Sequence, residues 1–589
     1  MDLARPRPIS IALWGCLIFS LALLLYAANR GFSLLDEAYY VAIIADPAWF
    51  TASLHAYALP MHLIFVAFGK SLIALRLFGV VVLVSTTAIL GDALKRYYVA
   101  IGALNDEPKL AAMGALFSLT YFVFWIMTPS YNLVVTSGAV LILAGALHWA
   151  IDDHDRKRTA WQDSLASLLV GLGGCFAFFG KAPFAVIAAV AIAIFLVRVA
   201  IKRGARVAVI RAAVTAVSCL IPLIATLEAT GGVADFITKT QVALVAIDMG
   251  NRPHQLPYYV VHQLLAAPPT VVISALSLAL VALVRWRRAG AVPPILRGFA
   301  LAWLAFDLFT FLARAVYRAA LGDSPWLYVG MPMIAICLAL FTYIVARSDH
   351  WVQPAGALTP LGLLFAMPFA TGFGTATPWL AHVGGDLYAF LLVIVLCGRL
   401  FFAERTARLL ELVAILFCPV ALLVSAFAPL ELQNSIFKQT ELVSLPFTAD
   451  KIRVETLTRD YLVGLRRIAV AGGLKADTPI FDLSGGAPGT ALLLNNRAPV
   501  YSWVLPMLPG SIATADGIWA ATPPDQQRRA WIVGDVDPRL AASKVATSFL
   551  RRQHEYVKVG EMDMVFWTER HHIVIWKPRE NSEDLKPAT

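Results

Sequence analysis

Residues 9–40 read ISIALWGCLIFSLALLLYAANRGFSLLDEAYY, an apolar run that leads within a few residues to two adjacent carboxylates, Asp36 and Glu37. The first twenty of these residues carry no charge, and a helix of about 20 apolar residues can cross the hydrocarbon core of a bilayer. We interpret the run as a retained first helix and not as a removed signal peptide, because no small-residue cleavage site follows before Asp36. The carboxylate pair then lies just outside a membrane span.

The rest of the chain repeats this apolar pattern. Of its 589 residues 59% are hydrophobic and only 15% are charged, which is typical of a polytopic membrane protein. Thirteen apolar runs precede residue 430, and we predict a helix in each because a spanning helix satisfies its own backbone groups. They lie near 9–28, 72–91, 110–127, 132–151, 164–180, 183–199, 212–229, 269–285, 298–316, 326–346, 357–373, 384–402 and 408–428.

The distribution of Lys and Arg predicts how these spans are oriented. Clusters such as Arg156-Lys157-Arg158 and Arg285-Trp286-Arg287-Arg288 fall in every second loop, on the same side as Arg5 and Arg7, whereas the other loops hold scattered single cations. The positive-inside rule then places the N-terminus in the cytoplasm of a bacterial-type inner (plasma) membrane. An odd number of spans puts Asp36 and everything after residue 430 on the extracytoplasmic side.

The net charge of +10 therefore needs no nucleic-acid partner, because it belongs to the membrane half of the chain. All six cysteines fall in predicted spans, so no disulfide framework and no thiolate metal site can be inferred.

Two regions lie outside the spans. The first loop, 29–71, is half apolar, and its stretches Glu37–Phe50 and Pro60–Gly69 favour short helices lying in the membrane interface. After residue 430 the composition becomes that of a soluble protein, with strand patterns at 479–483, 530–535, 556–559 and 573–576 and helical spacing at 450–471 and 538–550. We predict a multi-span membrane domain over 1–430 and a small extracytoplasmic α/β domain over 431–589.

The surroundings of Asp36 resemble a known family. Asp36-Glu37-Ala38-Tyr39-Tyr40, the Pro-containing stretch 58–62 and the basic residue of Leu75-Arg76-Leu77 follow one another in this order. This order resembles the first loop of the GT-C superfamily of integral-membrane glycosyltransferases, in the branch of the protein O-mannosyltransferases and the lipid A aminoarabinose transferase. The thirteen runs and the C-terminal α/β domain are similar to that branch as well.

The resemblance implies transfer of a sugar from a polyprenyl-phosphate donor to a cell-envelope acceptor, which would be a lipid, a polysaccharide or a protein. It implies that Asp36 acts as general base toward the acceptor, with Glu37 orienting Asp36, capping the helix or helping to bind a divalent ion, and with Tyr39 and Tyr40 contacting substrate. The residues alone leave an alternative open, since Asp36 would equally suit the N-cap of a helix.

A leaving phosphate needs nearby cations. Lys181 lies in a predicted outer turn, where it runs against the positive-inside trend, and it matches a Lys-small-Pro element of the family. Arg314 and Arg318 are i, i+4 neighbours at the outer end of a span. For all three side chains the alternative is snorkelling to the interface.

Three further motifs are weaker. Tyr131 and Asn132, in Pro129-Ser130-Tyr131-Asn132, could hydrogen-bond a sugar, although turn chemistry explains the same residues. His55 and His62 could join Asp36 in holding a metal ion, so the need for a divalent cofactor stays open, and the alternative is a structural role. Gly485-Gly486-Ala487-Pro488-Gly489 lacks the spacing of a nucleotide-binding loop, and a structural turn explains it better.

Two other classes of function remain open. A transporter or flippase also has many spans, but it typically shows paired repeats and interrupted helices, which this sequence lacks. A non-catalytic assembly or sensor protein would depend on the C-terminal domain alone.

Overall fold

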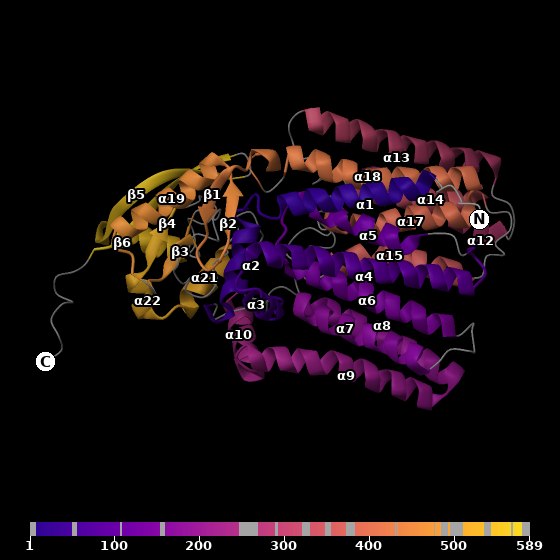
Figure 1. Ribbon diagram of the computed structural model, residues 1–589, viewed down its shortest axis with the longest axis horizontal. Helices are drawn as coiled ribbons and strands as arrows, with labels where there is room; N and C mark the ends of the chain where they lie inside the picture. The colour runs from indigo at the N-terminus through magenta and orange to yellow at the C-terminus, as the bar shows by residue number, and fades with distance from the viewer. Residues whose placement is uncertain are drawn as a thin grey trace, which may run out of the picture.

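The computed structural model describes residues 8–49, 56–105, 109–152, 160–246, 269–288, 293–320, 330–347, 355–372, 383–429, 432, 434–475, 478–483, 493–494, 511–534, 544–566 and 569–579. A long bundle of helices fills one end of the molecule and a smaller sheet-containing region fills the other (Figure 1). We call the end of the bundle that carries this region the sheet-bearing end.

Each of the thirteen predicted runs falls on a helix. These are α1 (Pro8–Ala27), α4 (Leu72–Ala100), α5 (Leu110–Ser118), α6 (Tyr131–Asp152), α7 (Ala160–Gly180), α8 (Ala182–Arg203), α9 (Ala205–Ala229), α12 (Pro269–Arg288), α13 (Pro294–Ala320), α14 (Gly330–Arg347), α15 (Leu358–Gly372), α17 (Leu387–Phe401) and α18 (Glu404–Phe427). In the part of the chain that the structure describes, seven of them are long and apolar enough to cross a membrane by themselves: α1, α4, α6, α7, α8, α9 and α18. The chain is a polytopic helical membrane protein.

One run departs from the prediction. Instead of one continuous span over 110–127, α5 ends at Ser118 and a 3-10 helix, η2 (Leu119–Phe124), continues it. Trp125 then adopts a left-handed backbone with φ of 60° and donates its indole N–H to Ser425 of α18, 3.0 Å away. The tighter turn and the positive φ redirect the chain toward Thr128 and the start of α6.

Small residues bring the helices close together. A side chain at Gly138 of α6 would meet the Gly173 carbonyl at 2.7 Å, and one at Gly180 of α7 would meet the Val135 amide at 2.5 Å. Helix association in lipid depends on such close backbone approach, since burial of apolar surface contributes little there. Pairing α6 with α7 also brings Tyr131, the first residue of α6, next to Lys181, which follows α7.

The first loop forms α2 (Asp36–Ala45), a 3-10 turn η1 (Pro47–Trp49) and α3 (Ala58–Ala67), as the sequence indicated. The expectation of amphipathic interfacial helices is wrong for α2, because every residue from Glu37 to Ile44 is buried. Figure 1 shows the reason: α2 and α3 lie between the bundle and the sheets, beside α10 (Val233–Ala246).

The C-terminal region contains two sheets. β1 (Glu441–Ser444) and β2 (Lys451–Val454) form an antiparallel pair. β3 (Ile480–Asp482), β4 (Trp531–Val533), β6 (Glu569–Pro578) and β5 (Tyr556–Phe566) form a second sheet in this order, with β3 parallel to β4 and the other pairs antiparallel. The predicted helix over 450–471 starts later than expected. Residues 451–454 are strand, and Glu455 caps α19 (Thr456–Ala471) by accepting from the Thr458 amide at 3.2 Å.

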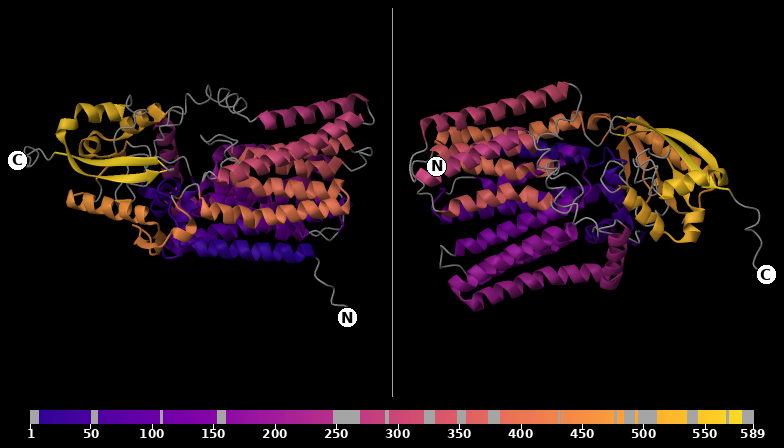
Figure 2. Two further views of the ribbon diagram at one scale, coloured as in Figure 1. Left: turned by 90° about the horizontal axis from the view of Figure 1, so that it is seen from above. Right: turned by 180° about the vertical axis from the view of Figure 1, so that it is seen from behind.

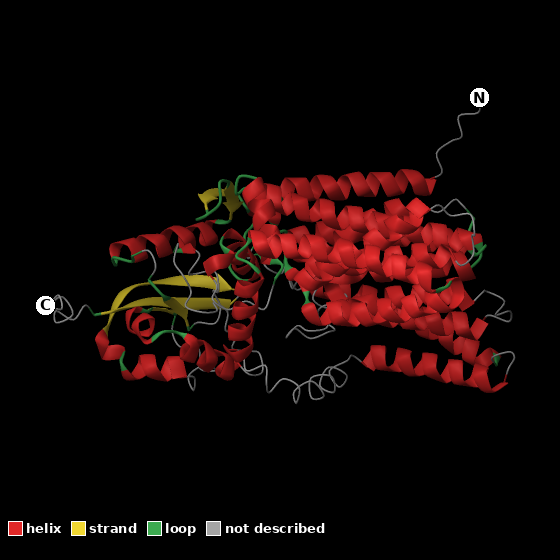
Figure 3. Cartoon of the chain, turned by 90° about the horizontal axis from the view of Figure 1, so that it is seen from below, coloured by secondary structure: helices red, strands yellow, loops and turns green. Residues whose placement is uncertain are grey.

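Helices cover both faces of the second sheet. Along β4, Trp531 and Val533 belong to the apolar cluster that includes α19, whereas Ile532 packs with α21 (Ser511–Ala521) and α23 (Lys544–Arg551). This alternation is the period of two expected for a strand buried on both faces. A short helix, α22 (Pro524–Arg529), completes the region, which Figures 2 and 3 show from other sides.

Candidate active site

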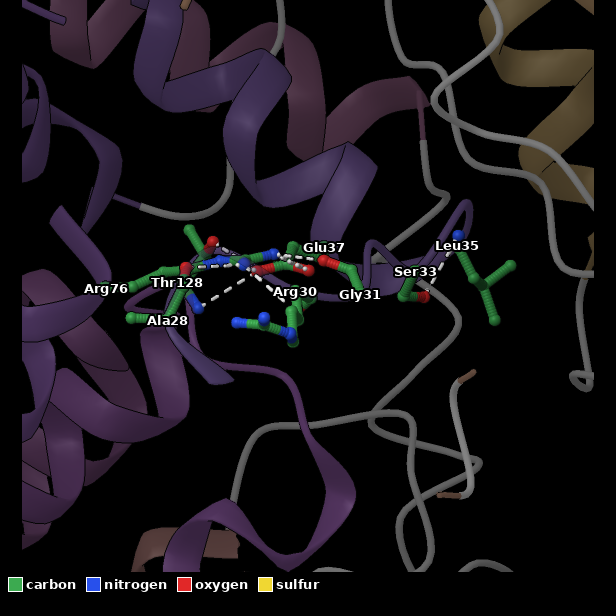
Figure 4. A network of polar contacts seen from close by, with 8 residues as sticks. All are labelled: Ala28, Arg30, Gly31, Ser33, Leu35, Glu37, Arg76 and Thr128. Carbon is green, nitrogen blue, oxygen red and sulfur yellow. Dashed lines mark hydrogen bonds and ion pairs between the residues drawn. The ribbon is translucent and has the colours of Figure 1, made fainter. Parts of the chain in front are cut away.

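Glu37 lies at the centre of a buried polar network at the sheet-bearing end (Figure 4). Its carboxylate is fully buried and forms a two-pronged ion pair with Arg76 of α4, with Nε and Nη2 at 2.9 and 2.8 Å from the two oxygens. Thr128 donates to the same carboxylate twice, from its hydroxyl at 2.6 Å and from its amide at 3.2 Å. Four charge-assisted hydrogen bonds of this kind satisfy the Glu37 carboxylate.

Arg76 uses its remaining donors on the loop between α1 and α2. The guanidinium donates to the carbonyls of Ala28 at 2.9 Å, Gly31 at 2.8 Å and Arg30 at 3.4 Å. The loop that leads into α2 is therefore tied to α4 at several points. Because Glu37 and Asp36 are adjacent in the first turn of α2, the network also holds the backbone of Asp36.

Asp36 differs from its neighbour in being only partly buried. It is the first residue of α2, where a negative charge is stabilised by the helix dipole. The capping alternative does not hold, since the cap position is Leu35 and no side chain makes a cap hydrogen bond there. Asp36 thus combines a backbone that the network holds in place with a side chain that is not fully enclosed.

Aromatic rings border this carboxylate. Tyr40, one turn along α2, has its ring centre 6.0 Å from those of Tyr57 and Tyr131. Burial raises the pKa of Tyr40 well above its usual value, and the negative charge of Asp36 raises it further. Tyr40 is a neutral phenol at physiological pH. Tyr39, also buried, contacts Tyr40 edge-on at 6.0 Å.

Lys181 continues the site beyond Tyr131. Its ammonium lies 5.3 Å from the centre of the Tyr131 ring and donates to the Thr371 carbonyl at 2.5 Å. The residue lies in the turn between α7 and α8, not within either span, and only 5% of its surface is exposed. Burial lowers its pKa to about 7, and the carboxylate of Asp386 acts in the opposite direction.

Asp386 is a buried carboxylate that no motif in the sequence had indicated. It ends a short 3-10 helix, η6 (Val383–Asp386), immediately before α17, and accepts hydroxyl hydrogen bonds from Thr136 at 2.9 Å and Thr371 at 2.8 Å. The signal that could have found it is an acidic residue at the start of an apolar run, the same pattern that selected Asp36. Thr128 and Tyr57 carried no comparable signal.

Asn132 is the second residue of α6, beside Tyr131. Its side-chain oxygen is buried, and no hydrogen-bond donor reaches it among the residues that the structure describes. Buried polar atoms are nearly always paired, so an unsatisfied amide oxygen at this place suits a donor from a bound molecule.

Of the other predicted site residues, the structure describes the side chain of His62 and not those of His55, Arg314 and Arg318. The histidine His62, on α3, donates from Nδ1 to the Ile44 carbonyl at 2.8 Å, and His55 lies outside the described residues. Within the described ranges no group of three His, Cys, Asp or Glu side chains is arranged to hold a metal ion. Arg314 and Arg318 belong to α13, which packs on α14, and their side chains lie outside the described part, as does the Gly485–Gly489 turn.

Comparison with known proteins gives two similar structures. One is ArnT from Cupriavidus metallidurans bound to undecaprenyl phosphate, with a TM-score of 0.38 and 12% identity, and the other is the apo state of ArnT, with a TM-score of 0.37 and 13% identity. Each alignment covers 96% of this chain and 97% of the other. Neither a protein-family model nor a curated protein matches the chain.

Proposed function

We propose that the protein is a membrane glycosyltransferase that moves a sugar from a polyprenyl-phosphate donor to a cell-envelope acceptor, with Asp36 as the general base. The observation that carries the proposal is the different surroundings of two adjacent carboxylates. The Glu37 carboxylate is bound by Arg76 and Thr128, whereas Asp36 is held in place by the same network and stays partly exposed. A proton acceptor needs this combination of fixed position and access.

The reaction would be a single displacement. The acceptor hydroxyl or amine attacks the anomeric carbon of the sugar, its proton passes to the Asp36 carboxylate, and the bond to the phosphate oxygen breaks. One displacement inverts the anomeric centre. The leaving polyprenyl phosphate gains negative charge, and we place it near Lys181, whose ammonium lies 5.3 Å from the centre of the Tyr131 ring.

Tyr39, Tyr40, Tyr131 and Asn132 would contact the sugar and the lipid phosphate. Aromatic rings provide flat apolar surfaces, and the Asn132 oxygen provides an unused acceptor. Glu37 would orient Asp36 through the backbone of α2. The proposed setting is the extracytoplasmic face of a bacterial-type inner membrane, which rests on the distribution of Lys and Arg.

Replacing Asp36 by asparagine tests the proposal. We expect D36N to abolish transfer, because a carboxamide cannot accept the proton, while the amount of protein in the membrane and its thermal stability remain those of the wild type. Mass spectrometry of envelope lipids, polysaccharides and proteins from cells with and without the protein would identify the transferred sugar and measure it.

Asp46 offers a matched control in the same loop. It follows α2 directly and accepts a hydrogen bond from the Ala48 amide at 3.0 Å, which an asparagine oxygen can also accept. D46N should therefore retain wild-type transfer. Full activity of D36N would refute the assignment of Asp36, and absence of any sugar difference between wild-type and deleted cells would refute the transferase function.

A further inference from the structure

The C-terminal region contacts the first loop through backbone hydrogen bonds of β2. The Gly31 amide donates to the Arg453 carbonyl at 2.8 Å, and the Arg453 amide donates to the Asn29 carbonyl at 2.7 Å. These two bonds form a single parallel β-bridge between Arg30, in the loop after α1, and Arg453 of β2. The Gly31 carbonyl is also one of the acceptors of Arg76, so the same glycine joins the C-terminal region to the site network.

The residues just before β2 hold the other side of the loop, at the start of α4. Asp450 accepts a hydrogen bond from the Ser71 hydroxyl at 2.7 Å and another from the Ile73 amide at 2.9 Å. The Ala449 amide donates to the Lys70 carbonyl at 3.0 Å. A carboxylate is well placed here, because the first amides of a helix have no partner within the helix and its N-terminus attracts negative charge.

Residues 449–453 therefore hold both partners of the buried ion pair. They fix residues 29–31, which lead into α2 with Glu37, and residues 70–73, which open α4 about one turn before Arg76. A shift of either flank would move Glu37 relative to Arg76, and Asp36 would move with it. We call residues 449–453 the strap.

We propose that the strap positions Asp36 for proton transfer, with Asp450 as its main positioning residue, so that the C-terminal region takes part in the chemical step without touching the reacting atoms. This inference rests on the proposed function. It differs from simple tethering in one measurable way: loosening the strap should slow transfer and leave binding of the lipid phosphate unchanged, since Lys181, Tyr131 and Asn132 belong to other elements.

The test compares D450A with D450N and D525A in the full-length protein. D450A removes both hydrogen bonds, whereas the carboxamide oxygen of D450N can still accept from Ser71 and Ile73. Asp525 lies exposed on α22 in the same region, and within the described residues its one charged contact is a long one with Arg529, at 3.5 Å, so D525A controls for loss of a surface charge.

We expect transfer by D450A to fall about 10- to 100-fold, the loss typical of a small displacement of a reacting group. Undecaprenyl phosphate, used as the probe for lipid-phosphate binding, should bind to D450A within about twofold of its wild-type affinity. Transfer by D450N should stay within a few fold of that of the wild type, and transfer by D525A should equal that of the wild type. Hydrogen exchange of the amides in residues 28–40 should accelerate in D450A alone.

Wild-type transfer by D450A would overturn the inference, and so would equal losses of transfer and of undecaprenyl phosphate binding. If D450A is not recovered in the membrane, S71A takes its place, because it removes the hydroxyl that donates to Asp450. Loss of transfer in S71A with normal lipid binding would support the strap, and accelerated exchange without loss of transfer would overturn it. If the wild-type protein itself transfers no sugar, the proposed function fails. Exchange then decides the strap alone: unchanged protection of residues 28–40 in D450A overturns it.

Discussion

At the scale of single residues, the ion pair of Glu37 and Arg76 is the contact of the site whose disruption should lower the stability of the protein most. Both side chains are almost completely buried, and a buried charge that loses its partner is costly, by about 3–5 kcal/mol. We expect R76M to lower the thermal midpoint in detergent strongly, because it leaves the Glu37 carboxylate charged and without its cation. A midpoint equal to that of the wild type would show that the carboxylate does not depend on Arg76.

The double variant E37Q/R76M is the informative comparison. It removes the buried charge together with its partner, so it should be more stable than R76M alone. Recovery should be partial, because the carbonyls of Ala28, Arg30 and Gly31 still lose the donors that Arg76 provides. Complete recovery would mean that these carbonyls find other donors.

We expect Lys181 to make binding of the lipid phosphate in the proposed site dependent on pH. Its pKa is lowered to about 7 by burial, so the ammonium form is present below that pH and is lost as the pH rises through it. We expect the affinity for undecaprenyl phosphate to decline above about pH 7 in the wild type. K181R should keep its affinity at high pH, since a guanidinium stays charged, and K181M should bind weakly at all pH values.

The comparison with K181R also separates the titration of Lys181 from the titration of the phosphate itself. A phosphate monoester gains its second charge near pH ~6, which acts on all variants alike. If wild type and K181R show the same pH profile, then Lys181 does not contact the phosphate.

Adjacent residues show what could be read from the sequence at this scale. Charged residues beside an apolar run can be recognised in the sequence itself, and this pattern indicated Asp36 and Glu37. The sequence does not show that Glu37 is buried and paired while Asp36 stays partly exposed. This difference depends on Arg76 and Thr128, which lie 39 and 91 residues from Glu37 in the chain. Nor does the sequence show that α2 would lie between the bundle, α10 and the C-terminal region and be buried there (Figure 1).

At the scale of elements, the pairing of α6 with α7 depends on particular glycines. The apolar pattern that predicts the two helices does not distinguish these glycines from other small residues. A methyl group on Gly173 would lie 2.7 Å from the Gly138 carbonyl and 2.8 Å from the Ile142 amide, which are backbone atoms that cannot move aside. We expect G173A to force the two helices apart and to shift Lys181, which follows α7, away from Tyr131. Thermal stability and transfer should both fall.

The neighbouring Gly174 is a matched control on the same helix. Its nearest atom would be the Cys219 sulfur at 3.5 Å, an ordinary contact. Both substitutions gain the same helix propensity, so the difference between them isolates the steric clash, and G173A should be less stable than G174A by about 1–3 kcal/mol. Equal stability of the two variants, measured as thermal midpoints in detergent, would contradict the close packing of α6 on α7.

At the scale of the whole molecule, the arrangement of the bundle requires Asp36, Lys181 and the C-terminal region to lie on one side of the membrane, and the charge pattern predicts that this side is extracytoplasmic. Single cysteines can test this in a variant that lacks the six natural ones, all of which lie in helices of the bundle. Asp525 on α22 and Lys202 at the opposite end of α8 are both exposed, so D525C and K202C report on the two sides. A maleimide that cannot cross the membrane should label D525C in intact cells and K202C only after permeabilisation, with equal labelling of both in detergent as the control for reactivity.

The reverse pattern would place Asp36 in the cytoplasm. It would then exclude an extracytoplasmic acceptor while leaving the geometry of the site unchanged.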